Sequence, residues 1–552
     1  PFVDMMLGLA GSFQQAQALP INHYVNQTPS IYAQDNWHVT PNLSIQLGLR
    51  YDALPHAWER NNNLSNFDPN LYLSSQEPAY IGGNGALVAQ MDSNGPGFAT
   101  VNGNRYYLNG IYLAGQNGQP KGLVTNDYGT LQPRVGFSED LFGNGKTILR
   151  GGFGTFYERL QGNDIYNPAT TAPFFNNPSA SAVYFSNPGT SYVTGVPAAK
   201  PFFAQSATTL ARDYPAPAVA QFSLGVQHQI APSVIATVQY VGNIAWHQNI
   251  ERQINTYPLN TDMQIRANAG DSSNNSGTNP NHQSLSNSDF YRTYQGWGNL
   301  NQQENTTNGN YTGFQTGIRV QNRWGLSGEL DYTWSHEIDI TSYDLGGVSN
   351  PWNLKYDKGS GALDRRNILS GNYVYDLPIF RGSSGLVHSL LGGWQIAGTG
   401  IFQSGGIIAN QGPGLSIGYD TIGLGGGYTN RPDVVSKVHY SKKVNDWFDT
   451  SAFAAPTPAW EGSTTQGFGT ARKDTVLGPG RLNFTTSLYK TFDITERVHL
   501  ELRFESYNTF NHTEFNGVNS TFRGNGAKAG NFGQISSAFD PRTLQLGGKI
   551  NF

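Results

Sequence analysis

The sequence predicts an all-β protein, an antiparallel transmembrane β-barrel, and three observations lead to this prediction. Apolar and polar residues alternate along many short segments, so that each expected strand has one apolar and one polar face. Short turns alternate with loops of about 30 to 80 residues. Finally, glycine and aromatic residues are abundant (66 Gly, 29 Tyr, 30 Phe, 10 Trp), and only 13% of the 552 residues are charged. A membrane barrel requires the alternation, because one face of each strand meets lipid and the other a polar lumen.

Composition excludes several other classes. No apolar run approaches the roughly 18 to 20 residues of a membrane helix, so a membrane would be crossed by strands. The absence of cysteine excludes disulfides and thiolate chemistry, and the net charge of -4 argues against a nucleic-acid partner. The sequence begins Pro1-Phe2-Val3-Asp4 without a signal peptide, which an exported protein needs. We therefore expect residues 1–552 to be the carboxy-terminal part of one barrel domain of a longer protein.

The strands are expected as hairpins joined by short turns. The clearest early strand, 42–52, places Leu43, Leu47 and Tyr51 on one face and Gln46 and Arg50 on the other. The same alternation recurs to the end of the chain. The expected hairpins join 30–38 with 42–52, 131–140 with 146–159, 221–230 with 234–240, 311–322 with 326–336, 366–377 with 394–404, and 482–492 with 497–508.

The last segment, 542–552, is expected to be the final strand of the barrel. Its apolar face consists of Leu544, Leu546, Ile550 and Phe552, whereas Thr543, Gln545, Lys549 and Asn551 form the polar face. With this segment the count is roughly thirteen strands, or fourteen if residues 7–17 form one.

The asymmetry of the connections favours a membrane barrel over a soluble β fold. Antiparallel strands place all short turns at one end and all long loops at the other, as periplasmic turns and extracellular loops are placed in outer-membrane barrels. This places the carboxy terminus in the periplasm. A soluble sandwich seldom has such long loops on one side only, and a propeller would show a regular period.

No residue pattern identifies catalysis, a cofactor or a metal. Residues 335–339 (SHEID) could be parts of a hydrolase or metal site, but mixed polar residues are ordinary where a strand meets a loop. Residues 364–366 (DRR) are better explained as a lumen or rim charge cluster. Residues 143–147 (GNGKT) resemble the end of a phosphate loop but suit a hairpin turn better. Trp37, Trp334 and Trp394 lie near strand ends, where interfacial aromatics are expected, although core packing is the alternative.

Several stretches together resemble the TonB-dependent outer-membrane receptors of the Oar-like type, from end to end of the chain. They are residues 2–8 (FVDMMLG), 32–41 (YAQDNWHVTP), 47–52 (LGLRYD), 132–137 (QPRVGF), 143–147 (GNGKT), 332–335 (YTWS), 364–367 (DRRN), 391–395 (LGGWQ), 504–512 (FESYNTFNH) and the closing strand.

The resemblance implies a plug with a TonB-binding box ahead of a barrel of about 22 strands. This sequence begins where that barrel is already under way, so it contains neither plug nor box. The implied function is TonB-coupled uptake of an unknown extracellular nutrient through contact with the TonB complex, and not enzymatic catalysis. A structural or adhesive outer-membrane protein is the alternative.

The resemblance also implies a role for the end of the chain. In such barrels a terminal aromatic on an alternating strand is the signal read by the barrel assembly machinery, here Phe552 with Ile550, Leu546 and Leu544. Outer-membrane lipid is the other implied partner.

Overall fold

The fold is known from a computed structural model of the chain. It describes residues 2–15, 21–81, 90–160, 162–175, 179–193, 202, 204–261, 291–380, 382–383, 385–408, 414–418, 420–424, 429–524 and 530–552.

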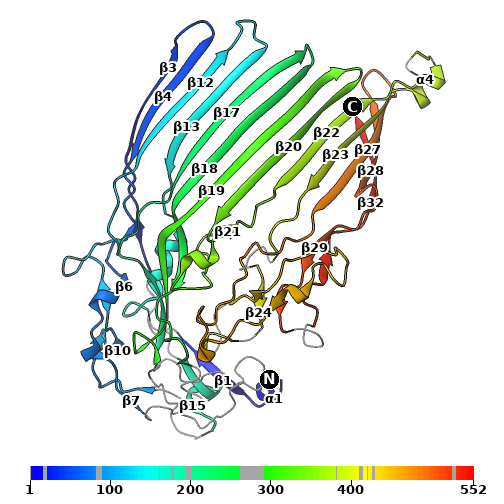
Figure 1. Ribbon diagram of the computed structural model, residues 1–552. Helices are drawn as coiled ribbons and strands as arrows, with labels where there is room; N and C mark the ends of the chain where they lie inside the picture. Colours follow the sequence, from blue (N-terminus) through cyan, green and yellow to red (C-terminus); the bar gives the residue numbers. More distant parts are fainter. Residues whose placement is uncertain are drawn as a thin grey trace.

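One large curved sheet dominates the structure (Figure 1). Thirteen strands follow one another along it, and every neighbouring pair on this path is antiparallel. Short connections join alternate pairs into hairpins, and long loops join the remaining pairs. In order they are β3 (Ser30–His38), β4 (Leu43–Asp52), β12 (Leu131–Asp140), β13 (Thr147–Tyr157), β17 (Ala218–Ala231), β18 (Val234–Gln253), β19 (Trp297–Arg323), β20 (Leu326–Asp339), β22 (Asn367–Asp376), β23 (Trp394–Gln403), β27 (Arg481–Asp493), β28 (His499–Tyr507) and β32 (Thr543–Asn551).

Shorter elements lie mostly in the loops between these strands. The helices are α1 (Phe2–Met6), α2 (Gly162–Tyr166) and α4 (Gly385–Leu391). The short strands are β1 (Leu9–Gln14), β2 (Tyr24–Val25), β5 (Trp58–Glu59), β6 (Ser65–Phe67), β7 (Tyr80–Ile81), β8 (Gln90–Met91), β9 (Phe98–Val101), β10 (Asn104–Tyr107), β11 (Ile111–Leu113), β14 (Ser179–Tyr184), β15 (Asn187–Ser191), β16 (Gln205–Leu210), β21 (Gly359–Ser360), β24 (Ser416–Ile417), β25 (Asp433–Val434), β26 (Phe453–Ala454), β29 (Phe515–Val518), β30 (Thr521–Phe522) and β31 (Ile535–Ala538).

The six expected hairpins and the final strand are confirmed, because the strand bounds follow the alternation of apolar and polar residues. The possible fourteenth strand is wrong as a member of the sheet. Residues 9–14 do form a strand, β1, but it pairs with β14 in a separate small sheet. Alternation is a local signal and does not select the pairing partner. Strands β18 and β19 also extend further into the loop region than expected.

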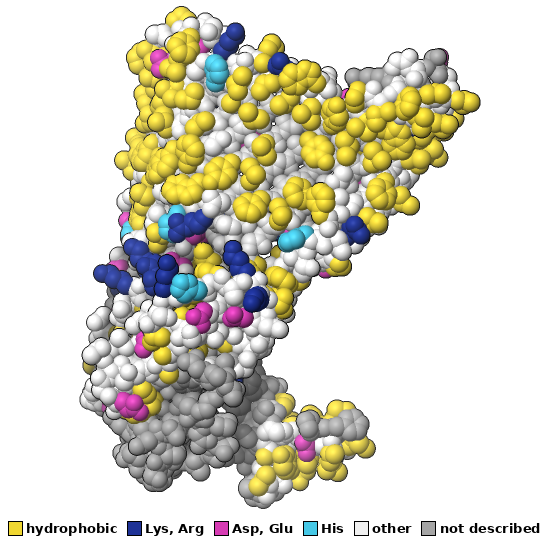
Figure 2. All heavy atoms as spheres, turned by 45° about the vertical axis from the view of Figure 1, so that its right-hand side comes forward, with side chains coloured by type: hydrophobic (Ala, Val, Ile, Leu, Met, Phe, Trp, Pro, Cys, Tyr) yellow, Lys and Arg dark blue, Asp and Glu magenta, His cyan; other side chains and the backbone are white. Residues whose placement is uncertain are grey.

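One face of the sheet is covered by exposed apolar side chains. Leu47, Leu224, Leu330 and Leu546 belong to strands spread across the whole sheet and are between 45% and 81% exposed. Figure 2 shows the resulting hydrophobic band across the strands, with Lys, Arg, Asp and Glu gathered at its edge toward the loops. An exposed apolar surface of this extent indicates contact with lipid or a partner rather than water.

The long loops gather at one end of the sheet, while the short turns and α4 lie at the other, together with the carboxy terminus (Figure 1). These two ends are called the loop end and the turn end below. The described loops pack into four hydrophobic clusters instead of extending separately into solvent. In one of them Phe448, Phe453 and Phe532 meet edge to face with ring centroids 5.3 to 5.7 Å apart.

A buried ion pair supports this loop layer. The guanidinium of Arg431 is fully buried, pairs with the Asp357 carboxylate, and lies 4.2 Å from the centre of the Tyr356 ring. Burial of a charge is tolerated only with such pairing. In the part of the chain that the structure describes, no helix is both long and apolar enough to cross a membrane.

Candidate functional site

The polar face of the sheet carries a continuous row of side chains. By register, Gln34, Gly48, Arg134, Gly154, Gln221, Asn243, Tyr311 and Glu337 lie side by side on β3, β4, β12, β13, β17, β18, β19 and β20. Glycine replaces a side chain at several of these and neighbouring positions, which hollows the surface. The result is a trough of about 740 Å³, called the central trough below.

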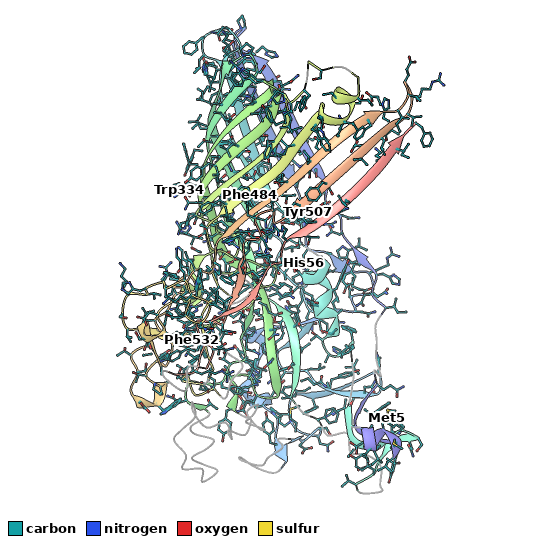
Figure 3. All side chains as sticks on the ribbon, turned by 90° about the vertical axis from the view of Figure 1, so that its right-hand side faces the viewer. Met5, His56, Trp334, Phe484, Tyr507 and Phe532 are labelled. Carbon is teal, nitrogen blue, oxygen red and sulfur yellow. The ribbon has the colours of Figure 1, made fainter. Side chains whose placement is uncertain are left out.

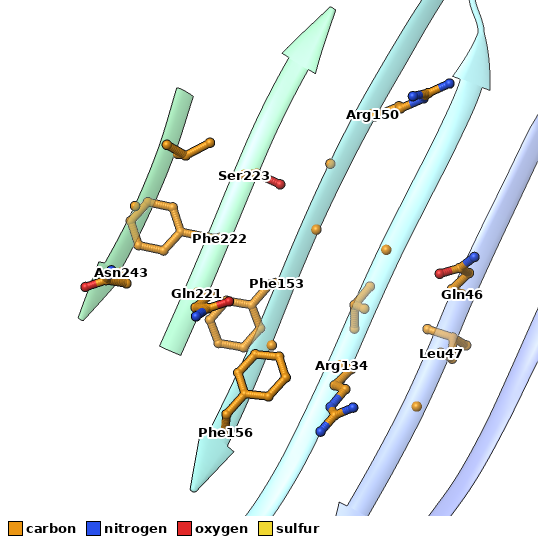
Figure 4. Close-up of a pocket in the computed structure, with 18 of the residues that line it drawn as sticks. Gln46, Leu47, Arg134, Arg150, Phe153, Phe156, Gln221, Phe222, Ser223 and Asn243 are labelled. Carbon is orange, nitrogen blue, oxygen red and sulfur yellow. The ribbon is translucent and has the colours of Figure 1, made fainter. Parts of the chain in front are cut away.

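The central trough carries cationic groups (Figure 4). Arg134 and Arg150 line it from the adjacent strands β12 and β13, together with Gln46 and Gln221. The Arg134 guanidinium lies 4.6 Å from the centre of the Phe156 ring, a cation–π contact that holds it against the sheet. These side chains suit hydrogen bonding to a polar solute.

A second cavity, of about 350 Å³, lies at the loop end of the same face and is called the rim cavity below. Asn243, Tyr311 and Glu337, the last members of the row, form part of its wall. Its other walls come from residues 158–160 after β13, from Asp164 of α2, and from residues 341–344, which follow β20. Three sheet strands and two loops therefore meet around this cavity.

A β-bulge in β18 shapes one wall. The register to β19 shifts between Ala245 and Gln248, and His247 has a positive φ of 55°. A bulge changes the direction of the side chains that follow it. Here Asn249 is placed so that its amide donates to the Asp344 carboxylate, while its carbonyl oxygen accepts the Leu345 N–H at 3.2 Å. The loop after β20 is thereby attached to the sheet.

The opposite wall contains Asp164 of α2. This side chain is buried, and the Tyr214 hydroxyl donates to its Oδ2 at 3.3 Å. Tyr214 in turn packs edge to face against His56, with ring centroids 6.0 Å apart. Burial, reinforced by the nearby Asp344 carboxylate, raises the pKa of Asp164 to about 6. Burial also lowers the pKa of His56 to about 4, so that His56 is neutral at pH 7.

Carboxylates dominate the rim cavity. Its acidic lining residues are Glu158, Asp164, Glu337, Asp339 and Asp344, whereas Arg159 is the cationic member of the described lining. Asp339 is neutralised by an ion pair with the buried Lys473. Even so, the cavity is negative, in contrast to the central trough with its two arginines.

The polar residues that the sequence singled out at this end do lie together. His336 and Arg366 each approach Asp364 Oδ2 at 3.3 Å, and the Glu337 N–H donates to Asp364 Oδ1 at 3.0 Å. This is the expected charge cluster at the rim. Within the described residues no group of three His, Asp or Glu side chains is placed to hold a metal ion.

Residues 143–147 form a hairpin turn between β12 and β13. The sequence favoured this interpretation over a phosphate loop. Gly143 and Gly145 have φ values of 66° and 69°, which glycine adopts without strain. The Asp140 carboxylate accepts the Gly145 N–H at 2.6 Å and closes the turn. Since β13 follows instead of a helix, no helix terminus is present to bind phosphate.

The three tryptophans occupy both ends of the apolar face. Trp37 and Trp394 lie at the turn end, on β3 and β23, whereas Trp334 lies toward the loop end of β20. Trp37 and Trp334 are about half exposed, while Trp394 is partly covered and donates to the Leu390 carbonyl at 3.2 Å. Figure 3 shows Trp334 at the same level as Phe484, where the sheet meets the loops. An interfacial role for the three remains a prediction.

The end of the chain is an edge strand. β32 pairs with β28 along its whole length, from Tyr507 opposite Thr543 to His499 opposite Asn551. Leu544, Leu546, Ile550 and Phe552 all lie exposed, and the Phe552 side chain is 97% exposed. Their role in assembly remains a prediction.

Residues 1–545 match the family model of the outer membrane beta barrel domain. The chain belongs to this family. The large antiparallel sheet is therefore a transmembrane barrel sheet, and its apolar face is the one that meets the outer membrane.

Solved structures give a distant likeness, and no curated protein matches the chain. The outer membrane transporter YddB from Escherichia coli shares 12% identity at a TM-score of 0.43, with 96% of this chain and 54% of that chain covered. The siderophore receptor PirA from Acinetobacter baumannii shares 11% identity at a TM-score of 0.38, with 95% of this chain and 45% of that chain covered. The pyoverdine outer membrane receptor FpvA from Pseudomonas aeruginosa PAO1 shares 10% identity at a TM-score of 0.37, with 96% of this chain and 43% of that chain covered. The chain thus spans about half the length of these proteins, which are described as transporters and receptors rather than enzymes.

Sequence reasoning missed the rim cavity. Glu337 stood out only as part of a mixed polar segment, and Asp164 lies in a loop without alternation. Strand register and loop packing bring these residues together. Their separations in the sequence do not predict that they lie close in space. The accumulation of acidic residues near the loop ends of β13 and β20 was the one available indication.

Proposed function

We propose that residues 1–552 are the carboxy-terminal part of the barrel domain of a TonB-dependent receptor that takes up an extracellular solute. The observation that carries this proposal is the position of the rim cavity. It lies at the loop end of the polar face, beneath packed loops, on a sheet whose other face is apolar. A solute bound there stands at the entrance to the barrel interior.

In this proposal the loops select the solute and the polar face guides it inward. The central trough continues the polar surface from the rim cavity, since Asn243 and Tyr311 line both. The energy comes from the TonB complex.

The different connections at the two ends of the sheet support the orientation in this proposal. The loop end faces the extracellular medium, and the turn end, with Phe552, faces the periplasm. The apolar band contacts outer-membrane lipid. The barrel assembly machinery binds the final strand through the row that ends in Phe552.

The test compares bacteria with and without the receptor. Mass spectrometry of the culture medium identifies solutes that wild-type cells deplete and cells lacking the gene do not. Depletion of these solutes is expected to stop when the TonB partner is deleted, while diffusion of a small sugar through porins continues unchanged. Depletion that persists without the partner contradicts coupled transport. Cell adhesion that depends on the protein, without any depletion, favours the adhesive alternative.

A further inference from the structure

The rim cavity contains a buried carboxylate oxygen without a partner. Asp164 is 1% exposed, and its Oδ2 accepts the Tyr214 hydroxyl, but its Oδ1 has no partner in hydrogen-bonding geometry within the described structure. The side-chain amide of Asn249 is near enough to lower the pKa of Asp164, but it donates its hydrogen bond to Asp344. A buried oxygen left in this state destabilises the protein, and such groups in native proteins are normally satisfied by a neighbour, water or a ligand. Asp164 lines the cavity, so a donor inside the cavity can supply the missing bond.

The charge around this oxygen specifies the donor. Glu158, Glu337 and Asp344 line the same cavity, and no Lys or Arg of the described chain forms an ion pair with them or with Asp164. Arg159 compensates only part of this charge. A cationic solute would be attracted by all of these groups, whereas an anionic solute would be repelled.

The geometry favours an organic cation over a metal ion. No three acidic or histidine side chains of the described residues are placed to coordinate one ion. The cavity of about 350 Å³ lies within the range that holds a small organic molecule. Tyr311 and Tyr343 also line it, and aromatic rings attract ammonium and guanidinium groups. Such groups carry several N–H donors, as Asp164 Oδ1 and its neighbours require.

We propose that the rim cavity binds an organic cation whose ammonium or guanidinium group donates to Asp164 Oδ1 and lies among the surrounding carboxylates. This inference rests on the proposed function, in which the cation is the solute taken up or the charged end of it. The central trough, with Arg134 and Arg150, has the opposite charge, so the preference for cations is a property of the rim cavity alone.

The binding test uses the purified full-length protein in detergent, where transport plays no part. Calorimetric titration at pH 7.5 and low salt compares three probes of similar length, which are 1,4-diaminobutane, 1,4-butanediol and succinate. The diamine is expected to bind, and the uncharged diol and the dianion are not. Equal binding of the diol, or no binding of the diamine, overturns the proposal.

Variants locate the binding site. Asp164→Asn removes the charge at nearly constant shape and is expected to weaken diamine binding at least tenfold, the loss typical of one charge-assisted hydrogen bond. Asp344→Asn is a second variant, placed in the loop after β20 and outside α2. Asp331→Asn is the matched control, because Asp331 lies on the same polar face of β20 but outside the cavity. Unchanged affinity in both cavity variants, or an equal loss in the control, contradicts the assignment.

Failure of this inference can be distinguished from failure of the proposed function. If the diamine binds to the rim cavity but TonB-dependent depletion is absent, the transport proposal fails and the binding site remains. If depletion depends on TonB but no cation binds, the receptor function remains and the cation assignment is wrong.

Discussion

Asp164→Asn is expected to stabilise the loop layer at neutral pH while it weakens binding of the cation. Burial and the nearby Asp344 raise the pKa of Asp164 from 3.8 to about 6, so the native state binds its proton more tightly than the unfolded state does. Stability is therefore greatest below pH 3.8 and is lost as the pH rises through about 6. Asparagine resembles the protonated acid and does not show this loss.

The magnitude follows from the same values. The difference between 3.8 and about 6 corresponds to a ceiling of about 3 kcal/mol at pH 7.5. Because Asp164 borders a polar cavity, screening reduces this to about 1 to 2 kcal/mol. Near pH 4 the difference in stability between the variant and the wild type should almost disappear. Glu158, Tyr214 and Asp344 also face Asp164, but they are common to both proteins, so their titration largely cancels.

Hydrogen–deuterium exchange of α2 (Gly162–Tyr166) measures this effect locally, without unfolding the barrel. At pH 7.5 these amides are expected to exchange about 5 to 30 times more slowly in the variant. Amides of β23, on a distant part of the sheet, provide an internal reference. Equal or faster exchange in the variant would refute the reasoning that the ionised Asp164 is destabilising in the empty cavity.

Three further predictions concern the strand, the orientation and the loop core. Deleting residues 544–552 should abolish membrane insertion, counted as heat-modifiable protein, because β28 would lose its partner and leave backbone groups unpaired in lipid. Phe552→Ala should reduce insertion less, since it removes at most roughly 2 to 3 kcal/mol of apolar burial; normal insertion of the deletion variant would contradict a closing role for this strand. A cysteine at Asn117, in a loop, should react with a membrane-impermeant reagent on intact cells, whereas one at Ser233, in the β17–β18 turn, should not; the reverse result would invert the orientation. Arg431→Met should destabilise the loop layer by about 3 to 5 kcal/mol, because it leaves a buried carboxylate without its cation, and limited proteolysis of the loops measures this.

The sequence also predicts that a cysteine at Ser273 would lie in a long loop and be labelled, but this position lies outside the residues that the structure describes. Asn117 is therefore the position with a structural basis.

The sequence by itself determined the strands and their two faces. The alternation in 43–52 and in 543–551 predicts which side chains are exposed on the apolar face, and Leu47 and Leu546 are indeed exposed there. This succeeds because side-chain direction in a strand repeats every two residues, so that a local pattern contains the whole answer. Hairpin partners follow equally well, since a short turn permits little but an antiparallel neighbour.

Only the tertiary structure decided how the loops fold and which polar side chains meet. Asp164 and Asp344 are separated by 180 positions in the chain, and they share a cavity because β17, β18 and β19 place the end of β13 next to the end of β20. The pairing of β1 with β14 could not be predicted for the same reason, because alternation does not identify which distant segment supplies the hydrogen bonds. Loop packing depends on contacts between residues far apart in sequence, and their energies leave no periodic pattern along the chain.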